Sequence, residues 1–514
     1  MATMVSVDLG AQSGRVALGR FDGETLSVSE VHRFPNVPVR AGGTLHWDVL
    51  RLHDGILDGL RAAAREAGGA VDSVGVDTWG LDFALLDRAG RLVQNPVHHR
   101  DARTDGAMGQ VFERVPAREL YERTGIQLIA INSVFQLWAM VASGDPALDA
   151  AETFLMVPDL FHYWLSGVKA CELTDATTSQ CYDPRAGAWA VDVLERLGVP
   201  PSLFPEVVPP GTVLGPLARD VADETRLERA VVVAPASHDT GSAVAAVPFR
   251  RTGSAYISSG TWSLVGVEVP EPVIDDRTFA ANLTNEGGVA GTFRLLRNVT
   301  GLWLLHECRR AWEREGRARD YAELVAQAEE APPLAALVDP NDPVFMPPGD
   351  MPARIREFCV RTGQEPPADD AAVVRCVLES LALKYRETIE LLAGATGVAP
   401  PELHVVGGGG LNRPLCRWTA EATGLPVLAG PVEAAELGNL VVQAMALGEV
   451  DSLEQARELV RRSFSPELYE PGEGGAWDDA YARFAALVQA DTGALRQAAR
   501  AQARVEEVIG PSRP

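Results

Sequence analysis

The sequence has no excess of basic residues: 46 lysines and arginines stand against 70 aspartates and glutamates, and the formal net charge is -24. Such a chain repels nucleic acid and anionic membranes, because neither finds a basic surface to bind. We therefore expect no partner of either kind. An anionic small molecule would need locally favourable groups, which backbone N–H groups, helix N-termini and a divalent cation supply.

The spacings of metal and redox sites and the long apolar runs of membrane spans are also missing. The six cysteines include no C-x-x-C pair, which argues against a zinc site or a thioredoxin-type motif. No segment approaches the roughly 20 apolar residues that cross a bilayer. Asp8 interrupts the first apolar run before the core of a signal peptide is complete. We expect a cytoplasmic protein with reduced cysteines.

What is present indicates two α/β domains, since 514 residues are too many for one hydrophobic core. Residues 4–8 and 16–20 predict two strands joined by a Gly-rich turn, and the same pattern returns at 255–267. We expect a first domain over 1–248, a second over 249–490 and a tail over 491–514. Further strands are predicted at 28–34, 74–77, 231–235 and 402–406, and helices at 48–66, 134–164, 301–314, 369–392 and from 412 onward.

Glycine-rich turns at strand ends are candidates for holding phosphates, although the G-x-x-x-x-G-K-[ST] sequence of P-loop proteins is absent. The first turn spans residues 10–15, where Ser13 offers a hydroxyl and Arg15 a positive charge, and the second spans 259–261. A plain β-hairpin turn accounts for such glycines equally well. The run Gly407–Gly410 between a strand and a helix fits either a nucleotide lying against the backbone or a flexible loop.

The candidates for chemistry stand where strands end. Asp239, in Ser237-His-Asp-Thr240, follows a strand and is a candidate general base for a sugar hydroxyl, but Ser, Asp and Thr are also common helix caps. Asp8 is a candidate ligand of Mg²⁺ through water. Trp79 either packs on a sugar face or fills the core. The polar residues 98–103 either line a substrate cleft or form a solvated ion-pair network.

Taken together, these motifs resemble the FGGY carbohydrate kinases, and the likeness covers about residues 4–470. The likeness is closest to the members that act on L-rhamnulose. The motifs that carry it occur in the family's order. They are Val7-Asp-Leu-Gly-Ala-Gln-Ser-Gly-Arg15, Asp77-Thr-Trp-Gly-Leu-Asp82, Arg100-Asp-Ala-Arg103, Tyr121-Glu-Arg-Thr-Gly-Ile-Gln127, Ser237-His-Asp-Thr240, Ser258-Ser-Gly-Thr-Trp-Ser263, Asn285-Glu-Gly-Gly288, Gly301-Leu-Trp-Leu-Leu305, Val406-Gly-Gly-Gly409 and Gly430-Pro-Val-Glu-Ala434.

The resemblance implies two actin-like, ribonuclease-H-type domains with ATP and sugar between them, the first domain binding mainly the sugar and the second mainly ATP. The implied reaction transfers a phosphoryl group from ATP, with Mg²⁺, to the 1-hydroxyl of L-rhamnulose, a step of rhamnose catabolism. Asp239 becomes the base. The implied ATP contacts are Ala11, Gln12, Ser13, Gly14, Arg15, Thr261, His306 and Gly408, and the implied sugar contacts are Gly80, His238, Asp239, Thr240 and Asn298.

Two positions depart from the family's pattern. His306 stands where better-known members have a glutamine that contacts ATP. A neutral imidazole is shorter and has a single donor, so this contact is the least certain part of the ATP site. Gln12 replaces a common serine, which a grip made by backbone N–H groups would tolerate.

Two other functions stay open at this point. A sister kinase of the same fold would act on another ketose, such as L-fuculose or a xylulose. An actin-like or chaperone-like ATPase would share the fold without phosphorylating a sugar.

Overall fold

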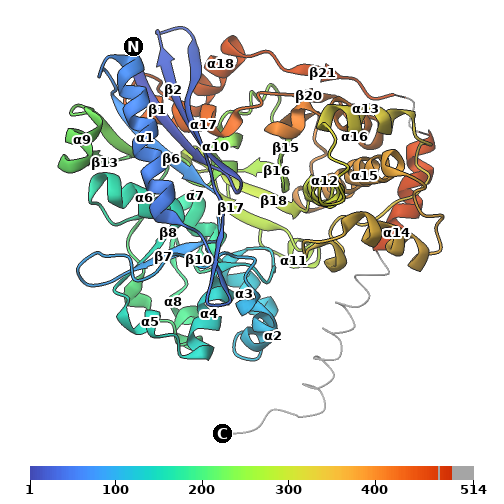
Figure 1. The fold of residues 1–514 in the computed structure, drawn as a ribbon, viewed down its shortest axis with the longest axis horizontal. Helices are drawn as coiled ribbons and strands as arrows, with labels where there is room; N and C mark the ends of the chain where they lie inside the picture. The colour runs from blue at the N-terminus through green and yellow to red at the C-terminus, as the bar shows by residue number, and fades with distance from the viewer. Residues whose placement is uncertain (473–474, 489–514) are drawn as a thin grey trace, which may run out of the picture.

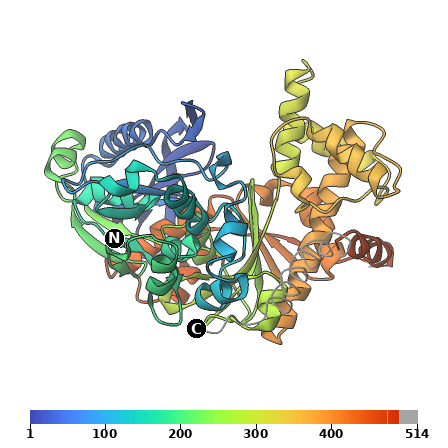
Figure 2. The ribbon, with the colours of Figure 1, turned by 90° about the horizontal axis from the view of Figure 1, so that it is seen from below.

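The computed structural model describes residues 1–472 and 475–488. Two mixed β-sheets, each flanked by helices, lie side by side (Figures 1 and 2). The tail predicted over 491–514 lies outside the described residues. Within them, no helix has the length and apolar character needed to cross a membrane.

The first sheet has six strands in the order β13-β14-β6-β1-β2-β3. Its centre is the hairpin of β1 and β2, and β6 pairs with β1 in parallel. The bounds are β1 Ala2–Leu9, β2 Ser13–Phe21, β3 Leu26–Pro35, β6 Ser73–Thr78, β13 Thr212–Pro216 and β14 Val231–Ala234. The carboxyl ends of β1, β6 and β14 therefore meet at one edge.

The second sheet repeats this plan in the order β17-β18-β16-β15-β19-β20-β21. Here β15 and β16 form the hairpin, and β19 pairs with β15 in parallel. The expected repetition of strand, turn and strand is thus confirmed. The bounds are β15 Ala255–Ser259, β16 Ser263–Val269, β17 Thr284–Gly287, β18 Phe293–Val299, β19 Leu403–Val406, β20 Val427–Ala429 and β21 Glu467–Tyr469.

The long helices follow the predicted positions, and Asp48 caps the first of them by accepting a hydrogen bond from the N–H of Arg51. The helix predicted throughout 134–164 is wrong in part. Strand β8, Thr153–Met156, divides it, because this buried apolar run pairs with β7, Phe83–Leu86. The longer helices are α1 Val49–Ala67, α4 Ser133–Ser143, α6 Val157–Ser166, α12 Trp303–Arg314, α13 Tyr321–Glu330, α14 Met351–Arg361, α15 Asp370–Thr396, α16 Arg413–Thr423, α17 Ala434–Ala446, α18 Leu453–Ser463 and a last helix at 475–488.

Shorter elements fill the connections between these helices and strands. The short helices are α2 Ala107–Phe112, α3 Ala117–Thr124, α5 Pro146–Ala150, α7 Leu173–Ala176, α8 Val191–Arg196, α9 Arg219–Thr225, α10 Asp239–Ala245 and α11 Asp276–Ala280. Three two-stranded pairs are β4 Val39–Ala41 with β5 Thr44–His46, β9 Cys171–Glu172 with β12 Val207–Val208, and β10 Tyr182–Asp183 with β11 Ala188–Trp189.

Helices α10 and α17 cross between the two sheets and tie them together (Figure 1). Ala243, Val244 and Val247, in and just after α10, pack with Tyr256 and Leu264 of the second sheet. In return, the apolar side of α17 packs against Met4 and Phe21 of the first sheet. Each half of the molecule therefore contributes a helix to the core of the other.

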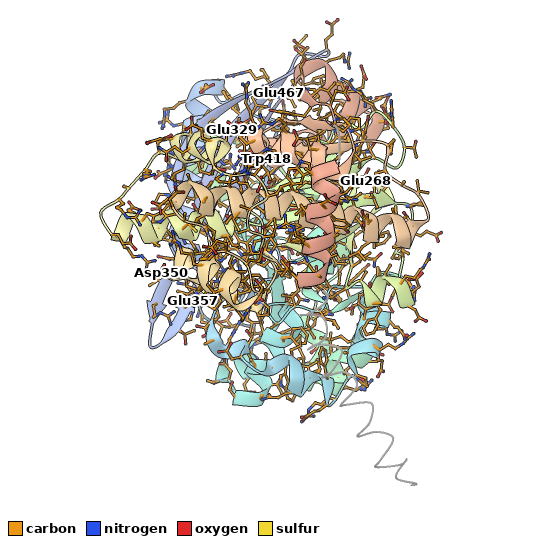
Figure 3. All side chains as sticks on the ribbon, turned by 90° about the vertical axis from the view of Figure 1, so that its right-hand side faces the viewer. Glu268, Glu329, Asp350, Glu357, Trp418 and Glu467 are labelled. Atoms are coloured by element: carbon orange, nitrogen blue, oxygen red, sulfur yellow. The ribbon has the colours of Figure 1, made fainter. Side chains whose placement is uncertain are left out.

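The outer face of the second domain is held by ion pairs and stacked cations between its helices (Figure 3). Glu329 of α13 pairs with Arg417 of α16 at 2.8 Å, and the Arg375 guanidinium lies 4.8 Å from the ring centroid of Trp418. Glu268 of strand β16 pairs with Arg457 of α18 at 2.7 Å. These contacts link α13 and α15 to α16, and α18 to the second sheet.

Candidate active site

Asp239 is the first residue of α10, at the edge where β6 and β14 end. The Thr78 N–H donates to the Ser237 carbonyl at 2.8 Å, which ties the junction to β6. The residue at the N-cap position is His238, and no side chain caps the helix, so the capping interpretation of this motif is wrong. The Asp239 carboxylate accepts from the Thr240 hydroxyl at 3.1 Å and keeps 34% of its side chain exposed. It is therefore available to a ligand.

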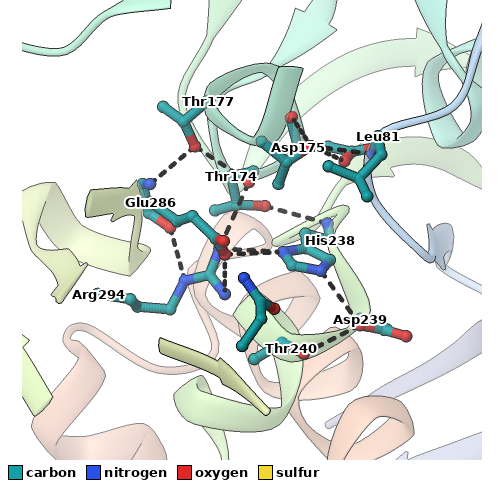
Figure 4. Close-up of polar contacts among 12 residues, drawn as sticks. Leu81, Thr174, Asp175, Thr177, His238, Asp239, Thr240, Glu286 and Arg294 are labelled. Carbon is teal, nitrogen blue, oxygen red and sulfur yellow. Dashed lines mark hydrogen bonds and ion pairs between the residues drawn. The ribbon is translucent and has the colours of Figure 1, made fainter. Parts of the chain in front are cut away.

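The backbone before Asp239 is held by buried side chains of the same domain (Figure 4). Glu172 Oε2 accepts from the Ser237 N–H at 2.9 Å, and Thr174 Oγ1 accepts from the His238 N–H at 3.1 Å. Burial raises the pKa of Glu172 to about 7, against the opposing effect of the hydrogen bonds from Thr174 and Ser237. The His238 ring then lies with Nε2 3.5 Å from Asp239 Oδ1.

Three carboxylates surround Arg15 near this edge. Asp8 and Asp77 are neighbours on parallel strands. Arg15 pairs with Asp8 at 2.7 Å and with Glu436, at the start of α17, at 2.8 Å. Burial, followed by the charge of Glu436, raises the pKa of Asp8 to about 8. Burial and the charge of Asp8 raise the pKa of Asp77, whose Oδ1 is buried without a partner.

The first expected phosphate turn is shorter than predicted, because residues 13–15 already belong to β2 and the turn is 10–12. Ala11 and Gln12 are exposed, and Asn36 holds the turn by donating to the carbonyls of Gly10 and Gln12. A Cβ on Gly14 would overlap the Phe34 ring. Gly14 is therefore explained by packing inside the domain rather than by a ligand.

The second turn, 260–262, adjoins the glycine run. A Cβ on Gly407 would lie 2.9 Å from the Ser259 carbonyl oxygen, and one on Gly409 would overlap the Ser259 side chain. These two glycines are required by the close approach of β15. Gly408 is exposed with open space beside it. Thr261, in the second turn, is half-buried. Its carbonyl accepts a hydrogen bond from the N–H of Trp303, at the start of α12, at 3.1 Å.

The expected sugar contacts lie around the ends of β6 and β18. Gly80 is buried, and a Cβ there would lie 2.9 Å from Thr178 Oγ1. The Leu81 N–H donates to that same hydroxyl at 3.1 Å. Asn298 is half-buried, and its amide donates to Gln127 Oε1 at 3.1 Å. Asn298 thus comes from the second domain and Gly80 from the first.

Trp79 belongs to a buried cluster around Asp82. The Asp82 carboxylate accepts from the indoles of Trp47 and Trp79 at 2.6 and 2.9 Å and contacts His99 Nδ1 at 2.7 Å. The ring centroids of Trp47 and His98 are 4.1 Å apart. The solvated ion-pair alternative for residues 98–103 is therefore wrong for the two histidines, which are buried.

His306 lies in the first turn of α12. Burial, followed by the charges of Arg309 and Arg310, lowers the pKa of His306 to about 4, so its imidazole is neutral near pH 7. Its Nδ1 is buried and has no partner. Each nitrogen of a neutral imidazole is either a donor or an acceptor, so Nδ1 can make one hydrogen bond to a ligand.

Comparison with known proteins places these features in a family. The models of the N-terminal and C-terminal domains of the FGGY family of carbohydrate kinases match residues 3–246 and 255–447. The chain belongs to the FGGY family of carbohydrate kinases. A curated rhamnulokinase of Bacteroides thetaiotaomicron is 43% identical over 479 residues, covering 93% of this chain and 98% of the relative. One from Pectobacterium atrosepticum is 40% identical over 495 residues, covering 95% and 97%.

Solved structures of a xylulose kinase and of a glycerol kinase share the fold. The ligand-bound xylulose kinase of Lactobacillus acidophilus superposes with a TM-score of 0.80 at 14% identity, covering 95% of this chain and 98% of that one. Plasmodium falciparum glycerol kinase with ADP gives 0.76 at 14% identity, covering 96% and 98%. The two-domain fold expected from the sequence is confirmed, and this protein is a carbohydrate kinase. The alternative of an ATPase without a sugar substrate is wrong.

Several residues of this FGGY kinase site escaped the sequence reasoning. Glu436 and Asn439 of α17 reach Arg15 and Asp77 from the other half of the chain, and Asn439 donates to Asp77 Oδ2 at 2.6 Å. Glu172 supports the turn before Asp239 by accepting from the Ser237 N–H, a contact that the sequence does not reveal. Glu286 stood inside one of the quoted motifs without a role. Among the described residues, no group of three or more His, Cys, Asp or Glu side chains is arranged as a metal cage.

Proposed function

We propose that this kinase transfers the terminal phosphoryl group of ATP to the 1-hydroxyl of L-rhamnulose, giving L-rhamnulose 1-phosphate and ADP. The observation that carries the substrate is the 40–43% identity, over at least 93% of the chain, to proteins named rhamnulokinase. A ketose breakdown step that consumes ATP takes place in the cytoplasm, which we infer as the location. The proposed domains are 1–248, mainly for sugar, and 249–490, mainly for ATP.

Asp239 is proposed as the general base. Its carboxylate is partly exposed and fixed by Thr240, and the turn that carries it is fixed by Glu172 and Thr174. As the hydroxyl oxygen of the sugar attacks the terminal phosphorus of ATP, its proton passes to Asp239 and the bond to ADP breaks. Gly80, His238, Thr240 and Asn298 would hold the sugar. Asn298 reaches the sugar from the second domain.

The phosphates of ATP are proposed to lie between the two hairpin turns. Ala11, Gln12 and Ser13 offer backbone N–H groups on one side, with Gly14 and Arg15 behind them, and Thr261 and Gly408 face them from the other domain. The open space beside Gly408 is what supports its contact with the nucleotide. The partnerless His306 nitrogen supports a single hydrogen bond in place of the glutamine of other members.

Asp8 and Asp77 fit a hydrated Mg²⁺. They are adjacent and leave the buried Asp77 Oδ1 without a partner, and Mg²⁺ in such enzymes typically uses one or two carboxylates and several waters. A bound Mg²⁺ would neutralise charge on the phosphates. Arg15 holds Asp8 in place through its ion pair.

A ketose panel tests this proposal. ADP release is measured with L-rhamnulose, L-fuculose, xylulose and no sugar, at saturating Mg-ATP. We expect the highest kcat/KM with L-rhamnulose and little release without sugar. Strong stimulation by L-fuculose with none by L-rhamnulose would overturn the substrate assignment in favour of a sister kinase.

A further inference from the structure

A buried ion pair of the second domain lies against His238 of the first. Glu286 on β17 and Arg294 on β18 are direct partners in the antiparallel pairing of the two strands. Arg294 Nη1 lies 3.1 Å from Glu286 Oε2, and both side chains are almost completely buried. The pair sits at the edge of the second sheet, where β17 is the outermost strand.

Contacts to the first domain fix this edge in place (Figure 4). The Gly287 N–H donates to Thr177 Oγ1 at 2.9 Å. A Cβ on Gly287 would lie 2.9 Å from Leu173 Cγ, so only glycine lets the strand approach α7 this closely. Arg294 donates through Nε to the Gly287 carbonyl at 2.8 Å and through Nη2 to the Thr174 carbonyl at 3.4 Å.

The same pair reaches the His238 ring. Glu286 Oε2 lies 3.2 Å from His238 Nδ1, and Arg294 Nη2 lies 3.3 Å from that nitrogen. Although burial raises it, the pKa of Glu286 is lowered overall by the charge of Arg294 and by its hydrogen bond with His238. The carboxylate can only accept and the guanidinium can only donate, so the pair engages Nδ1 and fixes the orientation of the ring. The opposite nitrogen, Nε2, then faces Asp239.

Fold stability alone does not account for this arrangement. Taking two charges out of water is costly, and buried ion pairs can often be replaced by apolar residues without loss of stability. In addition, Nε2 and Asp239 Oδ1 lie only 3.5 Å apart. Two neighbouring hydroxyls of a sugar can engage both of them.

We propose that Glu286 and Arg294 are positioning residues for the ketose: from the second domain they hold the His238 ring so that Nε2 contacts a sugar hydroxyl beside Asp239. This inference rests on the proposed function, because it takes the ketose as the ligand of His238. It also couples the sugar site of one domain to the edge strand of the other.

Kinetics of three variants test the inference. Glu286→Gln should raise the KM for L-rhamnulose about tenfold or more, since a hydrogen bond to a charged group is lost, and leave the KM for ATP within about twofold. The double variant Glu286→Gln with Arg294→Met removes both charges and leaves neither unpaired. It should recover the melting temperature but keep the raised sugar KM. The matched control is Glu379→Gln, which breaks the buried pair with Arg375 on α15, where the two atoms are 2.8 Å apart.

The double variant separates positioning from folding. If it regains both the melting temperature and the sugar KM of the unmodified chain, the positioning role is overturned. If Glu379→Gln raises the sugar KM as much as Glu286→Gln, the effect is a general one and the inference is likewise overturned. If the unmodified chain phosphorylates no ketose, the proposed function has failed first and this inference falls with it.

The environment of the ring gives a second, independent measurement. In protein carrying ¹⁵N-labelled histidine, the His238 signals are assigned by their loss in His238→Asn. We expect the Nδ1 signal of His238 to move in Glu286→Gln and to stay in place in Glu379→Gln. An unmoved Nδ1 signal in Glu286→Gln would overturn the role of Glu286 even where the KM values differ.

Discussion

The crossing of α10 and α17 should make Gly438 one of the least replaceable residues outside the site. A Cβ on Gly438 would overlap the Ser242 carbonyl and lie 2.9 Å from Ser242 Cα. The Cβ would also lie 2.3 Å from the Ser242 carbonyl carbon. Carbon atoms in contact keep about 3.5–4.0 Å, so Gly438→Ala must push the helices apart by roughly 1.2–1.7 Å. All the contacted atoms are backbone, so no side-chain rotation relieves the overlap.

We expect this variant to lose both stability and activity. Overpacking of this kind costs about 1–3 kcal/mol, which for a domain of this size lowers the melting temperature by about 2–12 °C. Because α10 carries Asp239 at its first residue, a displacement near 1 Å should also lower kcat by about 10- to 100-fold. Thermal unfolding and steady-state ADP release measure the two effects.

A matched control separates the crossing from the substitution itself. Gly394, inside α15, has no atom within 4 Å of the position of a Cβ. Gly394→Ala should therefore leave kcat unchanged and raise stability slightly, by about 0.5–1 kcal/mol. An unchanged melting temperature and kcat in Gly438→Ala would refute the account of the helix crossing.

Three further outcomes are expected. Asp239→Asn keeps the size but removes the proton acceptor, so kcat should fall about 10²–10⁴-fold with the Kd for ATP nearly unchanged; near-normal turnover would exclude Asp239 as the base. His306→Gln restores a side chain with both donor and acceptor and should lower the KM for ATP, whereas a raised KM would show that the imidazole is already the better contact. Burial lowers the pKa of His162 from 6.5 to about 3, so the stability gained from its neutral form is complete above pH 6.5 and is lost as the pH falls toward 3. Urea unfolding at pH 7 and pH 5 should differ by about 2 kcal/mol from this group, and His162→Gln should remove that part of the difference.

The repeated hairpins and the strand-to-helix junction could be predicted because local sequence determines them. Alternating apolar residues and a glycine turn determine the pairing of β1 with β2 and of β15 with β16. Asp48 and Asp369 cap the helices that were expected to begin at these residues. Strand β8 was missed because a four-residue apolar run between two helices is predicted as helix unless its partner strand, β7, is known.

The parts of the site that could not be predicted depend on partners far apart in the chain. Asn439 meets Asp77, and Glu436 meets Arg15, only because α17 packs on the first sheet. Gly14 and Gly409 looked like ligand positions, but both are needed to accommodate side chains of the protein itself. The presence of a glycine in a sequence does not say whether its neighbour is a ligand or the fold.

The ion pairs of Arg15 change how an acidic chain can hold ATP. From the sequence, Arg15 was the positive charge of the first phosphate turn. In the structure it is shared by Asp8 and Glu436, with Asp77 beside them. Because Asp8 and Glu436 both engage its guanidinium, Arg15 is not a free positive charge for a phosphate, in a chain whose formal charge is -24. Attraction for the phosphates would then come mainly from the backbone N–H groups of the two hairpin turns and from the Mg²⁺ that we propose at Asp8 and Asp77. With such a cation bound, these two carboxylates would favour ATP binding rather than oppose it.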